Sequence, residues 1–166
     1  LHDKAPSASP RRRVVLLGAS NLTRGISTVV ETARSTWNEP LSLWIAAGHG
    51  RSYGMQTSVF GRRLPGIIES GLWRSLANAP SAPTAALLTD IGNDLIYGSS
   101  VEVVVRWVET CLDRLAGPET TTILTGLPLE GLESRPRWQF DLLKRVFFPS
   151  RELRYEDVIE RAYQLD

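Results

Sequence analysis

The chain has 166 residues, enough for one domain with a substantial buried core. Its formal net charge of +1 gives no bulk electrostatic reason to expect a nucleic-acid partner or a membrane surface. The single cysteine, Cys111, excludes an intrachain disulfide and is compatible with a cytoplasmic location, and no apolar run is long enough to span a membrane.

Residues 1–12 are predicted to form a flexible leader, and residues 13–166 a single domain. Pro6, Pro10 and the Ser and Ala residues between them break regular structure, and no apolar residue recurs at a regular spacing. The domain contains neither an internal repeat nor a linker, so no second boundary is expected.

Four segments are predicted to be β-strands. The first is continuously apolar and partly β-branched, which is typical of a strand buried on both faces. The four ranges are Val14–Gly18, Leu41–Ala46, Ala85–Thr89 and Thr121–Thr125.

Helical patterns lie between and after these strands. Apolar side chains recur with the helical period over Leu22–Ser35. A later helix is predicted to begin with a capping box formed by Ser99 and Glu102 and to stop at Gly117 and Pro118. Further helices are predicted over Leu64–Leu76, Arg137–Phe147 and Arg151–Leu165.

Strand and helix alternate four times, which predicts an α/β domain with a parallel sheet between two helical layers. The last helical pattern runs to Asp166 without a C-cap glycine or a later proline. We expect such a helix to lead into a fifth strand, so we interpret the chain as truncated at its C-terminus.

Three polar turns follow the first three predicted strands, and they point to acyl-transfer chemistry. Ser20 lies where a strand turns into a helix, so its hydroxyl is expected at the sheet edge beside unpaired helical amides. The tetrahedral oxyanion of an acyl transfer needs hydrogen-bond donors fixed in advance. The backbone amides of Ser20 and Gly50 and the side-chain amide of Asn93 are the candidate donors.

These blocks resemble those of the SGNH (GDSL-type) hydrolase superfamily. The family's Gly-Asp-Ser motif corresponds to Gly18-Ala19-Ser20, its second-block glycine to Gly50 or, less closely, Gly48, and its Gly-x-Asn-Asp block to Gly92-Asn93-Asp94. The resemblance implies a flavodoxin-like fold, Ser20 as nucleophile and an oxyanion hole from Ser20, Gly50 and Asn93. It also implies hydrolysis of small esters or acetylated sugars without metal or cofactor.

Two departures from the family's pattern matter. Ala19 replaces the usual aspartate, so a local hydrogen-bonding network is expected to be absent or reorganised. The family's last block, Asp-x-x-His, has no match, so the isolated chain is expected to be nearly inactive. Truncation explains the missing block. The alternative is a catalytically inactive SGNH-like module that binds a glycan or a protein partner.

Other readings of the same residues are weaker. His49 adjoins Gly50, but we interpret it as a substrate contact or a loop residue rather than as the base. The glycines from Gly48 to Gly54 miss the spacing of a dinucleotide-binding fingerprint. Asp94 is interpreted as a structural hydrogen-bonding residue, and no zinc or calcium ligand cluster is visible.

Overall fold

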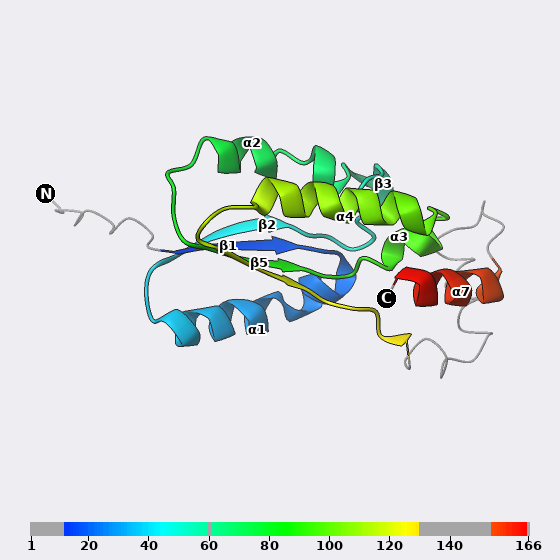
Figure 1. Ribbon diagram of the computed structural model, residues 1–166, viewed down its shortest axis with the longest axis horizontal. Helices are drawn as coiled ribbons and strands as arrows, with labels where there is room; N and C mark the ends of the chain where they lie inside the picture. Colours follow the sequence, from blue (N-terminus) through cyan, green and yellow to red (C-terminus); the bar gives the residue numbers. More distant parts are fainter. Residues whose placement is uncertain (1–11, 60, 130–153, 166) are drawn as a thin grey trace, which may run out of the picture.

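A four-stranded parallel sheet forms the centre of the protein in the computed structural model, which describes residues 12–59, 61–129 and 154–165. The spatial order of the strands is β2-β1-β5-β6, so β1 and β5 are the two central strands (Figure 1). The strands are β1 (Arg12–Leu17), β2 (Leu41–Ala46), β5 (Thr84–Leu88) and β6 (Thr120–Leu124).

Helices cover both faces of this sheet. Helix α1 (Ser20–Trp37) lies on one face, and α2 (Leu72–Ala77) and α4 (Val101–Leu115) lie on the other (Figure 1). This arrangement confirms the predicted three-layer α/β architecture. The fifth strand expected after Asp166 stays a prediction. No helix in the described ranges is both long and apolar enough to cross a membrane.

The core explains why the first strand is continuously apolar from Val14 to Leu17. Val15 and Leu17 pack in the cluster that contains the buried residues of α4, whereas Val14 and Leu16 pack against Leu22 and other residues of α1. Side chains alternate between the faces of a strand, so a strand covered on both sides needs apolar residues throughout. Cys111, predicted to be a small buried residue, lies in the α4 cluster.

The segment between β2 and β5 differs from its prediction. Instead of one helix over 64–76, it contains a hairpin of β3 (Thr57–Val59) and β4 (Arg62–Leu64), a 3₁₀ turn (Ile67–Glu69) and the short α2. Gly66 is one physical reason, because a Cβ at this position would lie 2.6 Å from the carbonyl carbon of Gly54. The chain needs a glycine there for close backbone approach rather than a helix former.

The predicted capping box is also wrong. The N-cap of α4 is Ser100, and its side chain makes no capping hydrogen bond. The backbone amide of Ser99 instead donates to the carbonyl of Asp94, 3.1 Å away, which ties Ser99 to the preceding turn. The helix predicted over Arg137–Phe147 lies outside the described residues, and α7 (Tyr155–Leu165) falls within the last predicted helix.

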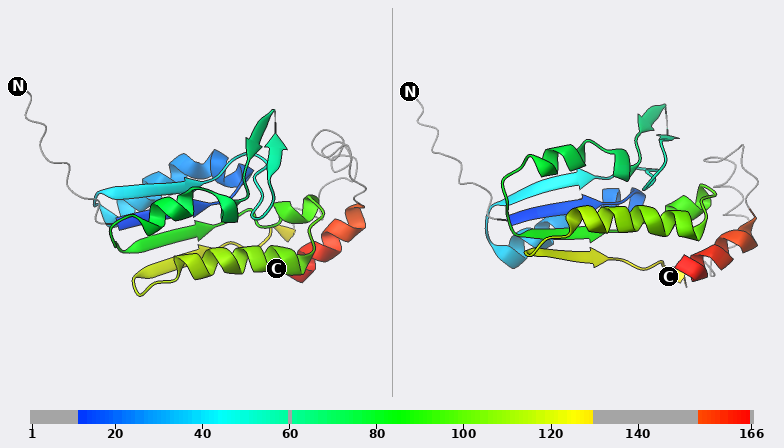
Figure 2. Two further views of the ribbon diagram at one scale, coloured as in Figure 1. Left: turned by 90° about the horizontal axis from the view of Figure 1, so that it is seen from above. Right: turned by 45° about the horizontal axis from the view of Figure 1, so that its top comes forward.

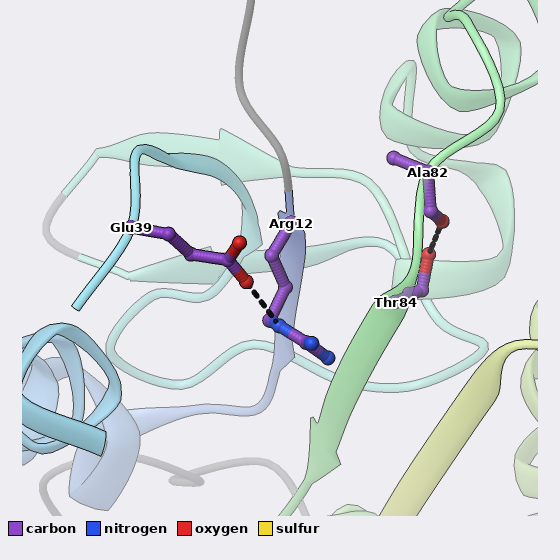
Figure 3. A network of polar contacts seen from close by, with 4 residues as sticks. All are labelled: Arg12, Glu39, Ala82 and Thr84. Atoms are coloured by element: carbon purple, nitrogen blue, oxygen red, sulfur yellow. Dashed lines mark hydrogen bonds and ion pairs between the residues drawn. The ribbon is translucent and has the colours of Figure 1, made fainter. Parts of the chain in front are cut away.

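Polar contacts hold the amino ends of the strands. Arg12, at the start of β1, donates from Nε to Glu39, just before β2, at 2.8 Å, and its guanidinium lies 4.8 Å from the centre of the Trp37 ring. At the start of β5, the hydroxyl of Thr84 donates to the carbonyl of Ala82 at 2.9 Å (Figure 3). A half-exposed ion pair of this kind contributes less than about 1 kcal/mol, so these contacts supplement the core rather than replace it.

The opposite, carboxyl edge of the sheet carries the other loops. Figure 2 shows the β3–β4 hairpin, α3 (Asn93–Ile96) and α7 beyond the arrowheads of the strands. Ligands of open parallel sheets bind at this edge. The residues that follow β1, β2 and β5 are therefore the candidates for a ligand-binding site.

Candidate active site

The fold brings Ser20, Gly50 and Asn93 to the same edge of the sheet. Each follows one of three adjacent strands, and the strand that leads to Ser20 lies between the other two. Neighbouring strands are about 4.8 Å apart, so the three loops meet above β1. The topology therefore places the three predicted residues at the same edge of the sheet, and their catalytic roles stay predictions.

Ser20 is the first residue of α1 and is half-buried. Its backbone amide has no acceptor among the described residues, whereas the amide of Thr23 already donates to the carbonyl of Ala19 at 3.0 Å. The first amides of a helix carry partial positive charge. Ser20 thus places its hydroxyl beside an unused donor in a field that favours an anion.

Asp90, directly after β5, caps this helix from another strand. Its Oδ2 accepts from the amides of Ala19 at 2.8 Å and Leu22 at 3.1 Å, and its Oδ1 accepts from the side-chain amide of Asn21 at 2.7 Å. Asp90 is held at φ 63°, in the left-handed region. The local network, expected to be absent or reorganised because Ala19 replaces the motif aspartate, is present here with a carboxylate from position 90.

Sequence reasoning missed this role of Asp90. The sequence feature that could have revealed it is the position of this aspartate, between the end of a predicted strand and Gly92-Asn93. Aspartate is a favoured N-cap and tolerates left-handed backbone, but the helix that it caps begins 70 residues earlier in the chain. Only the pairing of β1 with β5 brings the two together.

Gly50 lies in the loop after β2 with φ +68°. A Cβ at this position would collide with the Cγ2 of Val59, so only glycine fits both the backbone conformation and the space. Its carbonyl accepts from the hydroxyl of Tyr97 at 2.5 Å, which fixes the loop against α3. The amide of Gly50 has no acceptor among the described residues.

Asn93 is the first residue of α3 and is half-buried. Its backbone amide donates to the carbonyl of Asp90 at 3.2 Å. Its side-chain amide has no partner in the part of the chain that the structure describes. Asp90 therefore holds both turns: its side chain fixes the one at Ser20, and its carbonyl fixes the one at Asn93.

Asp94 joins α3 to the Gly50 loop from inside the protein. Its side chain is completely buried and accepts from the hydroxyl of Ser52 and, at 2.9 Å, from the amide of Tyr53. Burial raises the pKa of this carboxyl, although the two hydrogen bonds oppose the shift. A carboxylate with these partners and no exposure supports the structural role predicted for Asp94.

Tyr53 links the ends of the central strands. It is buried, and its hydroxyl donates to the carbonyl of Thr89 at 2.9 Å and approaches the carbonyl of Leu17 at 3.3 Å. Desolvation raises the pKa of this phenol well above its ordinary value, so the hydroxyl keeps its proton. Sequence reasoning did not single out this tyrosine.

The site contains no second histidine within the described ranges. The chain has His2 and His49, and only His49 belongs to the described residues. His49 is exposed, in the turn closed by the amide of Arg51 and the carbonyl of Gly48 at 3.1 Å. Across the described part of the chain, no three His, Cys, Asp or Glu side chains gather as metal ligands would.

Comparison with known proteins identifies the architecture. No protein-family model and no curated protein sequence matches the chain. Among solved structures, a carbohydrate acetylesterase family member from Sinorhizobium meliloti matches with a TM-score of 0.50 and 12% sequence identity. The match covers 93% of this chain and 74% of that one.

The two proteins share an α/β chain fold. At this low identity the match establishes the chain fold and not the chemistry. It confirms the resemblance inferred from the three sequence blocks as far as the α/β architecture is concerned. The roles of Ser20, Gly50 and Asn93 stay predictions.

We expect that replacing Asp90 with glycine lowers the free energy of unfolding by about 1–2 kcal/mol, because the amides of Ala19 and Leu22 at the start of α1 lose their acceptor. Glycine adopts the left-handed backbone without strain, and its greater freedom in the unfolded chain is matched in the control. Urea unfolding measures it. The matched control is Asn38→Gly, since Asn38 is exposed and has φ 45° at the other end of the same helix. Equal effects of the two substitutions would contradict the role of Asp90.

A second prediction concerns pH. The pKa of Asp94 is raised in the folded protein, so this carboxyl binds its proton more tightly there than in the unfolded chain. The free energy of unfolding, relative to that of Asp94→Asn, should fall as pH rises above the ordinary value of 3.8 and level off above the folded-state pKa. Denaturant unfolding across the acidic range measures this difference. Exposed Glu109→Gln is the control, and a difference that rises with pH would refute the assignment.

Proposed function

We propose that this domain is a serine hydrolase that cleaves a carboxylic ester through an acyl-enzyme on Ser20. The observation that carries the proposal is the capped turn at Ser20, where Asp90 takes the neighbouring amides of Ala19 and Leu22 and the amide of Ser20 has no acceptor among the described residues. An amide kept free beside a nucleophile is what an oxyanion hole requires. The α/β fold, which resembles that of a carbohydrate acetylesterase, is consistent with this activity.

In the proposed reaction the Ser20 hydroxyl attacks the ester carbonyl. The negative charge that develops on the carbonyl oxygen is stabilised by the amides of Ser20 and Gly50 and the side-chain amide of Asn93. All three lack an acceptor in the described structure, so the oxyanion replaces no internal hydrogen bond. The alcohol then leaves, and water hydrolyses the acyl-enzyme.

We infer that the general base of this mechanism is a histidine oriented by an aspartate, as the family resemblance implies. His49 is a poorer candidate, because it lies in the turn that presents Gly50 and its side chain is exposed. The 166-residue chain by itself should then hydrolyse esters very slowly.

The proposed substrate is a small acyl or acetyl ester of a sugar or metabolite. The matching solved structure is described as a carbohydrate acetylesterase. The proposed mechanism uses Ser20, Gly50 and Asn93 and requires neither a metal ion nor a cofactor.

We expect a fluorophosphonate probe to label the full-length protein on Ser20. Ser20→Ala should abolish labelling, and Asn93→Ala should slow it by about 10²–10³-fold because one oxyanion donor is lost. Mass spectrometry of the labelled peptide and labelling rates measure both effects. The exposed Ser27, in the next turn of α1, is the control position for Ser→Ala. A folded full-length protein that is not labelled would favour the alternative of an inactive module that binds a glycan or a protein.

A further inference from the structure

Arg51 is a buried cation beside the proposed oxyanion glycine. It directly follows Gly50, and only 9% of its surface is exposed. Its Nη1 approaches the carbonyl of Ala47, at the end of β2, at 3.4 Å. Because β2 is the neighbour of β1, this contact holds the guanidinium at the same sheet edge as Ser20.

The loop that carries Arg51 is fixed on both sides. The hydroxyl of Tyr97 donates to the carbonyl of Gly50, and the hydroxyl of Ser52 donates to the buried carboxylate of Asp94. The amide of Arg51 closes the turn onto the carbonyl of Gly48. The guanidinium is therefore presented by a backbone that three hydrogen bonds hold in place.

No carboxylate among the described residues is paired with this charge. The Nε of Arg51 is buried and has no hydrogen-bond acceptor, and the one ion pair in the described residues joins Arg12 to Glu39. The same burial lowers the pKa of the guanidinium, with no neighbouring carboxylate to oppose the shift. A buried charge is costly unless it is paired. Arg51 has free donors at the edge where parallel sheets bind ligands, so an anionic group of a ligand could pair with it.

We propose that Arg51 binds a carboxylate group on the ester substrate, so that the site prefers anionic over neutral esters. A guanidinium offers several donors in a fixed plane, which matches the two oxygens of a carboxylate. The contact with the carbonyl of Ala47 keeps the guanidinium at the sheet edge that carries the Gly50 loop. This inference rests on the proposed function for the identity of the ligand as an ester, but the binding of the anion does not depend on catalysis.

The experiment compares two probes of nearly the same shape, 4-acetoxybenzoate and its neutral methyl ester. Their dissociation constants are measured by calorimetry on full-length protein carrying Ser20→Ala, which prevents hydrolysis. The anionic probe should bind at least about tenfold more tightly than the neutral one. Adding Arg51→Met should remove the preference and leave the affinity for the neutral probe within about twofold.

Two further variants separate a binding role from general charge or structure. Arg62→Met removes an exposed arginine from β4 in the same part of the protein and should preserve the preference. Arg51→Lys should preserve part of it, because lysine keeps the charge but not the planar fork. The thermal midpoint of Arg51→Met should be unchanged or higher, since an uncompensated buried charge is removed.

Equal binding of the two probes, or a preference that survives Arg51→Met, would overturn the proposal. A marked loss of stability in Arg51→Met would also overturn it, because the guanidinium would then be a structural element. The fluorophosphonate experiment separates the two proposals. Labelling of Ser20 without an anion preference refutes only the role of Arg51, whereas an Arg51-dependent preference without labelling refutes only the hydrolase.

Discussion

The carboxylate of Asp90 is the contact on which the geometry of the site depends. It joins the carboxyl end of β5 to the first turn of α1 through two backbone amides, and the Asp90 carbonyl receives the amide of Asn93. One residue thus sets the positions of two turns that come from different strands. Both turns carry proposed oxyanion donors, so a shift at Asp90 would move them together.

The capping arrangement also decides which amides stay free. A helix N-terminus exposes several unpaired amides, and here Asp90 occupies those of Ala19 and Leu22. The amide of Ser20 lies between them and has no acceptor in the described structure. A cap supplied by the residue before Ser20 is impossible, since alanine at position 19 has no acceptor in its side chain. The carboxylate of Asp90, which follows β5, therefore stabilises the start of α1 and leaves the amide of Ser20 free for the reaction.

Buried side chains fix the Gly50 loop on the other side of the site. Asp94 and Ser52 lie in the interior and bind the Gly50 loop to α3, while Tyr53 ties the loop to the ends of β1 and β5. Gly50 is then held in a conformation that other residues rarely adopt. The same rigid loop carries the unpaired Arg51, so the position of the cation follows from the contacts that fix the glycine.

The sequence predicted the features that depend on local pattern. The strand over Leu41–Ala46 was predicted with its observed bounds, and the turn after each central strand was placed at the correct edge. The β3–β4 hairpin was missed because its strands are only three residues long and Pro65 follows them directly. The cap by Asp90 and the bonds of Tyr53 were missed because they join segments that are distant in the chain. Such contacts exist only once the strand order is known.

The proposed chemistry requires the edge above β1 to form an oxyanion hole around Ser20. The most direct measurement is a crystal structure of the full-length protein after reaction with a fluorophosphonate. We expect phosphorus on the Oγ of Ser20 and a phosphoryl oxygen within about 3.1 Å of the amides of Ser20 and Gly50 and of the Asn93 side chain. A phosphoryl oxygen that points to solvent and contacts none of these donors, or a probe attached to another residue, would contradict it.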